Sequence, residues 1–160
     1  MLKSLSVAGA VVIFDQITKQ IVRNSMELGE SFDILGSVLR FTFVENKGLA
    51  FSIKVSNIAI FTGLSFIASA VVFYYLYKYR NESFNIYLPL ALIFGGAIGN
   101  MIDRILFSKV VDFVDVGISS YRWPVFNIAD SAVSVGLVWF LIVSWTMKEL
   151  GEEPEKESAK

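Results

Sequence analysis

The sequence predicts an all-α membrane protein in which four transmembrane helices carry a small extramembrane β-sheet. Of the 160 residues, 54% are hydrophobic and the mean hydropathy is +0.58, which is too apolar for an ordinary soluble domain of this size. Two uncharged runs of 20 residues are each long enough to cross a hydrocarbon layer of about 30 Å as a helix. Between the first two predicted spans, apolar and polar residues alternate, which indicates a strand.

The four predicted spans cover approximately residues 2–22, 57–77, 83–104 and 130–148. The second and third contain the two uncharged runs, and the fourth carries Trp139 and Trp145 near its end, where aromatic side chains suit the headgroup level. The first span is interrupted by Asp15. A cleaved signal peptide is the competing interpretation of this segment. The absence of a small-x-small cleavage site after it favours an uncleaved helix.

The remaining segments complete a single predicted domain, residues 1–150. Residues 24–56 are expected to form the outer β region, with a turn at N-K-G. Residues 105–129 are expected to form an outer loop whose aromatic residues lie at the headgroup level. Residues 151–160 are charged and lack a run of apolar residues, so they are expected to be a disordered tail.

Composition excludes several classes of chemistry. The chain has no cysteine and no histidine, which removes disulfides, thiol nucleophiles, imidazole bases and the usual zinc, haem and iron–sulfur ligands. We therefore expect no metal and no cofactor. The net charge of −1 provides no basic surface for nucleic acid, so no nucleic-acid partner is expected. Any catalysis must use Asp, Glu, Lys, Ser, Thr or Tyr.

Two aspartates in short apolar settings are the first candidates for chemistry: Asp112 in V-V-D-F and Asp130 in F-N-I-A-D. A charge beside hydrocarbon costs about 2.5–3.5 kcal/mol on insertion scales, so such an acid usually has a partner and a function. Two carboxylates held close together share one proton and can activate water, which is aspartyl-protease chemistry. The structural alternatives are that Asp130 caps the fourth helix and that Asp112 is a loop acid near Lys109.

The end of the third span, F-G-G-A-I-G-N-M-I-D-R, is the second candidate. Gly95 and Gly99 form a small-xxx-small pattern that allows another helix to approach closely. Asn100, Asp103 and Arg104 share one helix face. Asp103 with Arg104 is an interfacial anchor in the structural interpretation, whereas Asn100 and Arg104 offer donors that can bind the carbonyls of an extended peptide.

Further polar positions are less specific. Asp15 and Lys19 are spaced to form an intramembrane ion pair on one helix face. Asn46 and Gly48 mark a turn. Asn127 is placed either to cap the last helix or to orient the neighbouring acid.

Taken together, these motifs resemble the bacterial lipoprotein signal peptidase family, also called signal peptidase II. The matching motifs, in order, are D-Q-I-T-K at Asp15–Lys19, N-K-G-L-A-F at Asn46–Phe51, G-A-I-G-N-M-I-D-R at Gly96–Arg104, V-V-D-F at Val110–Phe113 and F-N-I-A-D-S at Phe126–Ser131. The resemblance extends from Asp15 to the last span. Leu49, where a smaller residue is common in the family, is a departure that concerns the shape of its loop.

The resemblance implies a membrane aspartyl endopeptidase that removes the signal peptide from diacylglyceryl-modified prolipoproteins, cutting before the lipidated cysteine. It implies that Asp112 and Asp130 are the catalytic dyad. The implied supporting and substrate-binding residues are Asp15, Lys19, Asn46, Gly48, Gly96, Asn100, Arg104 and Asn127.

The resemblance also implies a location in the bacterial cytoplasmic (inner) membrane, with cytoplasmic termini and with the sheet and the active site at the outer face. The basic residues divide evenly between the two sides of the predicted topology, so the positive-inside rule does not decide the orientation. Membrane lipid is the second expected partner besides the prolipoprotein, and the chain is expected to be a monomer.

Two alternatives remain open at the level of sequence. A small membrane transporter or channel component would use the charged residues near membrane depth, namely Asp15, Lys19, Asp103 and Arg104. A Ser–Lys peptidase would use Lys19 to activate a serine.

Overall fold

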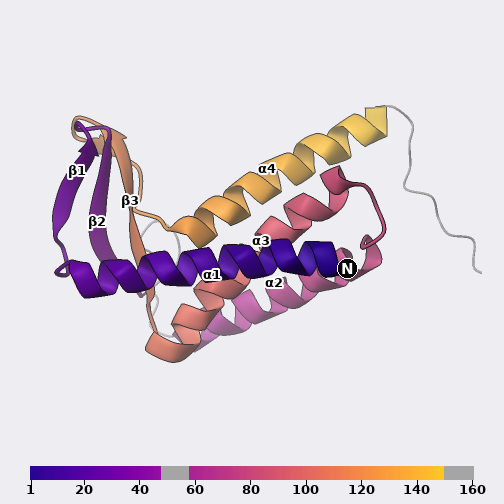
Figure 1. Ribbon diagram of the computed structural model, residues 1–160, viewed down its shortest axis with the longest axis horizontal. Helices are drawn as coiled ribbons and strands as arrows, with labels where there is room; N and C mark the ends of the chain where they lie inside the picture. The colour runs from indigo at the N-terminus through magenta and orange to yellow at the C-terminus, as the bar shows by residue number, and fades with distance from the viewer. Residues whose placement is uncertain (48–57, 150–160) are drawn as a thin grey trace, which may run out of the picture.

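The computed structural model describes residues 1–47 and 58–149, with side chains for residues 1–47 and 62–147. Its elements are α1 (Leu2–Ser25), β1 (Ser31–Leu35), β2 (Leu39–Asn46), α2 (Ile58–Lys78), α3 (Phe84–Phe107), β3 (Val110–Ile118), β4 (Tyr121–Arg122) and α4 (Ile128–Glu149). The helices form a bundle and the sheet stands at one end of it (Figure 1). The predicted combination of long helices with a small antiparallel sheet is confirmed.

Three helices within the described residues are long and apolar enough to cross a membrane: Leu2–Ser25, Phe84–Phe107 and Ile128–Met147. The chain is therefore a multi-pass membrane protein. Helix α2 has 21 residues, but the side chains of its first turn lie outside the described set, and its crossing remains a prediction. Helices α1 and α3 each continue three residues beyond the predicted spans and so reach the sheet.

Helix α1 has its apolar residues outside and its polar residues inside. Exposed apolar side chains on α1 include Ile13, Phe14, Ile17 and Ile21. Its buried residues are Ser4, Ala8, Asp15, Lys19 and Val22. A helix of a soluble protein has the opposite arrangement, because apolar side chains then avoid water. The inverted pattern fits a helix whose outer face contacts lipid and whose inner face carries the polar groups.

Helix α3 is central to the bundle and packs against α1, α2 and α4. Small residues make this close packing possible. A Cβ atom at Gly96 would collide with the carbonyl oxygen of Ala129 at the start of α4, and a Cβ at Gly99 would lie 2.7 Å from Asp15 Oδ2. The glycines therefore let the first turn of α4 and the Asp15 carboxylate approach the backbone of α3.

The sheet is antiparallel with the strand order β1-β2-β3-β4. The sequence pattern predicts its strands only in residues 24–56, whereas β3 and β4 come from the predicted outer loop. Strand β3 is buried on both faces over most of its length, so its residues V-V-D-F-V-D-V do not show the alternation of a half-buried strand. The predicted turn at Gly48 with the strand after it, and the predicted tail, lie outside the described residues.

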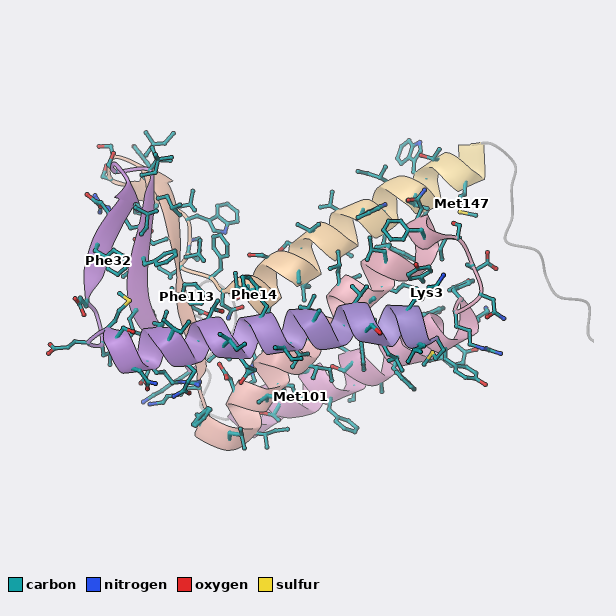
Figure 2. All side chains as sticks on the ribbon, in the orientation of Figure 1. Lys3, Phe14, Phe32, Met101, Phe113 and Met147 are labelled. Atoms are coloured by element: carbon teal, nitrogen blue, oxygen red, sulfur yellow. The ribbon has the colours of Figure 1, made fainter. Side chains whose placement is uncertain are left out.

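Two features place β3 beside the helices. Ser108 adopts a left-handed conformation with φ of 55°, which ends α3 and turns the chain into β3. Val22 at the end of α1 packs with Phe43, Val111 and Phe113 of the sheet. Phe113 thus lies where the sheet meets the bundle (Figure 2).

The opposite end of the bundle carries the N-terminus and the connection between α2 and α3. The Met1 ammonium donates to the carbonyl of Arg80 in that connection, with an N···O distance of 3.4 Å. Lys3 and Met147 also lie at the end of the bundle remote from the sheet (Figure 2). The start of α1 and the end of α4 therefore share one end of the molecule.

Candidate active site

Asp112 and Asp130 come from different elements that meet at the sheet end of the bundle. Asp112 is in β3 and is 3% exposed, whereas Asp130 is half-buried in the first turn of α4. Asn127 precedes α4, and its Oδ1 accepts a 2.9 Å hydrogen bond from the Asp130 backbone N–H. The Asp130 Oδ2 accepts in return from the Asn127 backbone N–H at 3.3 Å. This reciprocal pair is a capping box, so Asp130 has the capping role that the sequence left open.

Asn127 also binds the other aspartate. Its fully buried Nδ2 donates to Asp112 Oδ1 at 2.7 Å, and it approaches Asn100 Oδ1 at 3.0 Å. Because Asn127 Oδ1 accepts from a backbone N–H, the orientation of its amide is fixed. Asn127 therefore both caps the helix and orients the neighbouring Asp130, the two alternatives that its position predicts, and it also links Asp130 to Asp112.

Two further amides complete the hydrogen bonds to the carboxylates. Asn100 Nδ2 donates to Asp130 Oδ1 at 2.7 Å. Asn46 Nδ2, at the end of β2, donates to Asp112 Oδ2 at 3.0 Å, because the strand register places Asn46 opposite Val110 and near Asp112. Each carboxylate is thus held by neutral donors on both oxygens.

Burial and the neighbouring carboxylate both act on the proton affinity of Asp112. Burial, and after it the charge of Asp130, raise the pKa of Asp112 from 3.8 to about 7, against the opposing hydrogen bonds from Asn46 and Asn127. A carboxyl with such a pKa holds a proton at neutral pH in part of the population. That is the property that general acid–base catalysis by a carboxyl pair requires.

A second polar cluster, which we call the charge quartet, lies beside the acids and consists of Asp15, Lys19, Arg23 and Asp103. The Lys19 ammonium is 2.8 Å from Asp15 Oδ2 and 3.3 Å from Asp103 Oδ2, and Arg23 Nη2 is 3.0 Å from Asp103 Oδ1. The two cations balance the two carboxylates. The predicted Asp15–Lys19 ion pair is therefore present.

The remaining oxygens of the quartet bind backbone groups of the two elements that carry the acids. Asp15 Oδ1 accepts from the Ala129 N–H in the first turn of α4 at 2.9 Å. Asp103 Oδ2 accepts from the Val111 N–H in β3 at 3.1 Å. Each of these backbone N–H groups is adjacent to one of the paired acids. The quartet thus fixes the backbone on which Asp112 and Asp130 sit.

Arg104 lies near both acids without contacting either. Its half-buried guanidinium interacts electrostatically with Asp130 and Asp112, and it makes no ion pair or hydrogen bond with another side chain in the described part of the chain. A guanidinium has five hydrogen-bond donors, so Arg104 has donors available beside the two acids.

Gly48 lies outside the described residues, so its predicted contribution is not placed. The described ranges hold no group of three Asp or Glu residues arranged to bind a metal ion.

Sequence reasoning missed two members of this polar network and assigned a third, Asp103, to a different role. Arg23 pairs with Asp103, and Gln16 Nε2 donates to the Gly99 carbonyl at 3.1 Å and to Asp15 Oδ2 at 3.2 Å. Asp103 is a member of the quartet rather than an anchor paired with Arg104. The spacing of Asp15, Lys19 and Arg23 at i, i+4 and i+8 on one helix face was the signal that could have identified Arg23.

Comparison with known proteins identifies the family. The family model for "Signal peptidase (SPase) II" matches residues 7–146. The chain is 40% identical over 150 residues to a lipoprotein signal peptidase of Syntrophus aciditrophicus (strain SB), which covers 91% of this chain and 92% of that protein. It is 37% identical over 154 residues to a lipoprotein signal peptidase of Staphylococcus aureus (strain JH9), covering 96% and 93% of the two chains.

Two solved structures have the same fold. A bacterial membrane enzyme solved by the in meso method at 2.3 Å resolution superposes with a TM-score of 0.81 at 31% identity, covering 100% of this chain and 96% of the other. A second bacterial membrane enzyme, solved by the same method at 1.9 Å, gives a TM-score of 0.79 at 34% identity, covering 90% and 93%. With the family model spanning most of its length, this chain belongs to the signal peptidase II family.

Proposed function

We propose that this chain is a membrane aspartyl endopeptidase that removes the signal peptide from diacylglyceryl-modified prolipoproteins, cutting before the lipidated cysteine. The observation that carries the dyad assignment is the Asn127 side chain, which binds the Asp112 carboxylate and caps the helix turn that holds Asp130. The proteins named lipoprotein signal peptidase support the substrate class.

In the proposed reaction the dyad begins with one shared proton. The ionised carboxylate removes a proton from water, and the protonated carboxyl donates its proton toward the scissile carbonyl oxygen. The water oxygen bonds to the carbonyl carbon and gives a tetrahedral intermediate. The C–N bond then breaks, the amine nitrogen takes a proton from the dyad, and the hydroxyl proton of the intermediate returns to it. The products are a signal peptide with a new carboxylate and a lipoprotein whose first residue is the lipidated cysteine.

Arg104 is proposed to bind the substrate main chain. Its guanidinium is half-buried beside the dyad and is not committed to an ion pair with any described side chain. Peptide carbonyls of an extended substrate would accept its hydrogen bonds in a site with little competing water. Its positive charge would also stabilise the partial negative charge that develops on the carbonyl oxygen before proton transfer is complete.

The proposed topology has α2 as a fourth crossing, cytoplasmic termini, and the sheet with the dyad at the outer face of the cytoplasmic membrane, in a monomer. The contact between Met1 and Arg80 supports it, because it joins the N-terminus to the α2–α3 connection. The cysteine-free chain allows a direct test. A membrane-impermeant thiol reagent applied to whole cells should label Ser120→Cys, in the exposed β3–β4 turn, and not Asn81→Cys, in the α2–α3 connection.

The two alternative functions lack a supporting observation. The charges that a transporter would use are largely paired with one another in the quartet. Lys19 contacts Asp15, Asp103 and Asn100, and no described serine hydroxyl hydrogen-bonds its ammonium, as a Ser–Lys peptidase would require.

The decisive experiment compares a diacylated and a non-diacylated precursor, with the products identified by mass. The wild type should cut only the diacylated precursor, before the modified cysteine, and EDTA should not change the rate. Asp112→Asn and Asp130→Asn should each lower kcat by about 10²–10⁴. The matched control is Asp115→Asn, a buried aspartate of the same strand that pairs with Arg122 instead of the dyad and should leave cleavage intact. Full activity in either dyad variant refutes the proposal.

A further inference from the structure

Lys19 is a fully buried cation whose third contact is not explained by charge balance. Its ammonium lies 2.8 Å from Asp15 and 3.3 Å from Asp103, and it donates a 2.9 Å hydrogen bond to Asn100 Oδ1. With Arg23, these carboxylates already neutralise the cluster. An ammonium has three hydrogens and cannot accept a hydrogen bond, so the third hydrogen is directed to a neutral amide.

That contact determines which way the Asn100 amide faces. The two ends of an asparagine amide are nearly equal in shape, so their orientation depends on the groups around them. Lys19 can only donate, so the oxygen of Asn100 must face Lys19. The nitrogen must then face Asp130 Oδ1, which it reaches at 2.7 Å.

The same amide oxygen connects Lys19 to the other acid. Asn100 Oδ1 lies 3.0 Å from Asn127 Nδ2, and this nitrogen donates to Asp112 Oδ1 at 2.7 Å. One buried ammonium is therefore a single amide away from Asp130 and two amides away from Asp112.

We propose that Lys19 is a positioning residue for the peptidase reaction: its ammonium fixes the Asn100 amide, which in turn holds the two aspartates in their reactive arrangement. The inference rests on the dyad assignment made above. Lys19 acts through Asn100 and is not proposed to touch the substrate or the reacting atoms.

The charge of Lys19 has a second effect, on the proton equilibrium of the site. It lowers the pKa of Asp112, in opposition to burial and to Asp130. The charged and titratable groups that surround Lys19 from the elements packed against it are Asp15 and Arg23 on α1, Asp103 and Arg104 on α3, Asp112 on β3 and Asp130 on α4. Removal of the ammonium should raise the pKa of Asp112 still further above its ordinary value.

The test compares Lys19→Met with Arg23→Met. Both variants remove one positive charge from the quartet, but Arg23 binds Asp103 and makes no contact with Asn100. In cleavage of the diacylated precursor, Lys19→Met should lower kcat on the order of a hundredfold, with KM little changed, because the dyad is misplaced. The alkaline limb of its pH profile should move to higher pH. Arg23→Met should lower the thermal midpoint and should lower kcat much less than Lys19→Met does, with the pH limb left in place.

A second variant distinguishes a loss of activity caused by misfolding from one caused by a misplaced dyad. Lys19→Met combined with Asp15→Asn restores charge neutrality and keeps an oxygen for the Ala129 N–H. It should fold and show the same loss of kcat and the same shift of the pH limb. If both Lys19 variants match Arg23→Met in kcat and pH profile while the dyad variants are inactive, Lys19 is only structural. If instead Asp112→Asn or Asp130→Asn is active, the dyad assignment itself has failed.

Discussion

Two pairs of carboxylates lie side by side in this molecule, and they have different partners. Asp15 and Asp103, in the quartet, are fully buried and each contacts a cation within 3.3 Å. Asp112 and Asp130 contact amides and backbone N–H groups, and neither has a cation within ion-pair distance among the described residues. The residue type is the same, and Asp112 is almost as deeply buried as the quartet acids, whereas Asp130 is half-buried. The donors differ.

This difference in partners distinguishes the carboxylates that support the fold from the carboxylates that are suited to catalysis. The charge of a buried carboxylate paired with a cation is compensated by its partner, and its remaining lone pairs can fix a backbone N–H. A carboxylate held by neutral amides beside another carboxylate keeps its oxygens oriented while its charge remains uncompensated. Such a pair relieves the repulsion by sharing a proton. The charge of the partners therefore explains why one pair supports the fold and the other is suited to hydrolysis.

The largest expected effect on stability comes from breaking the quartet. Asp103→Asn leaves Lys19 and Arg23 with one carboxylate and weakens the acceptor of the Val111 N–H. An uncompensated buried charge costs about 3–5 kcal/mol. The thermal midpoint in detergent should fall sharply at every pH between 5 and 8. A stability equal to that of the wild type would mean that the quartet does not hold the fold together.

Asp112→Asn should have the opposite effect on stability, with a dependence on pH. Because the pKa of Asp112 is raised to about 7 in the folded protein, the native state binds this proton more tightly than the unfolded state. Its contribution to stability is complete below about pH 4 and is lost as the pH rises through 7. The asparagine variant avoids this loss and should exceed the wild type by about 1–3 kcal/mol at pH 8.

The control for this prediction is the pH itself. At pH 5 the folded carboxyl is protonated but the unfolded one is already largely ionised, so the advantage of Asp112→Asn should be smaller than at pH 8 and should disappear only below about pH 4. Thermal unfolding of both proteins across pH 5 to 8 measures the difference directly. A difference that does not vary with pH would show that Asp112 does not titrate in this range.

The activity of the wild type should fall as the pH rises above about 7, because the dyad then loses its shared proton. Asn46→Ala sharpens this prediction. The Asn46 hydrogen bond lowers the pKa of Asp112, so its removal should shift the alkaline limb of kcat/KM to higher pH and reduce kcat by about tenfold. The matched control is Thr42→Val on the same strand, because Thr42 donates to Asp115 instead. It should leave the limb in place.

The long helices were predictable because crossing lipid requires a long apolar run, which is visible in any sequence. The two aspartates were predictable because charge is rare in such surroundings. Strand β3 was not predictable from alternation, because burial on both faces makes V-V-D-F-V-D-V resemble the continuation of an apolar segment.

The partners of each acid were also beyond the sequence pattern. Asp103 is adjacent to Arg104 in the chain, yet it pairs with Lys19 and Arg23 from α1. Neighbours in sequence point to different sides of a helix, so the choice depends on how α1 and α3 pack. That packing in turn depends on Gly95 and Gly99, whose small size the sequence shows without showing what approaches them.

The smallest effect should come from an ion pair at the rim of the site. Lys109 Nζ lies 2.6 Å from Glu45 Oε1, next to Asn46 on the strand that reaches Asp112, but both side chains are partly exposed. Water screens such a pair, so Lys109→Ala should cost about 0.2–1 kcal/mol of stability and leave kcat unchanged. Thermal unfolding at low and high salt measures it, since the wild type alone should lose stability as salt rises. A large loss of activity would instead show that a cation near the dyad matters as much as the amides that bind Asp112 and Asp130. The charge of the partners would then no longer distinguish the two carboxylate pairs.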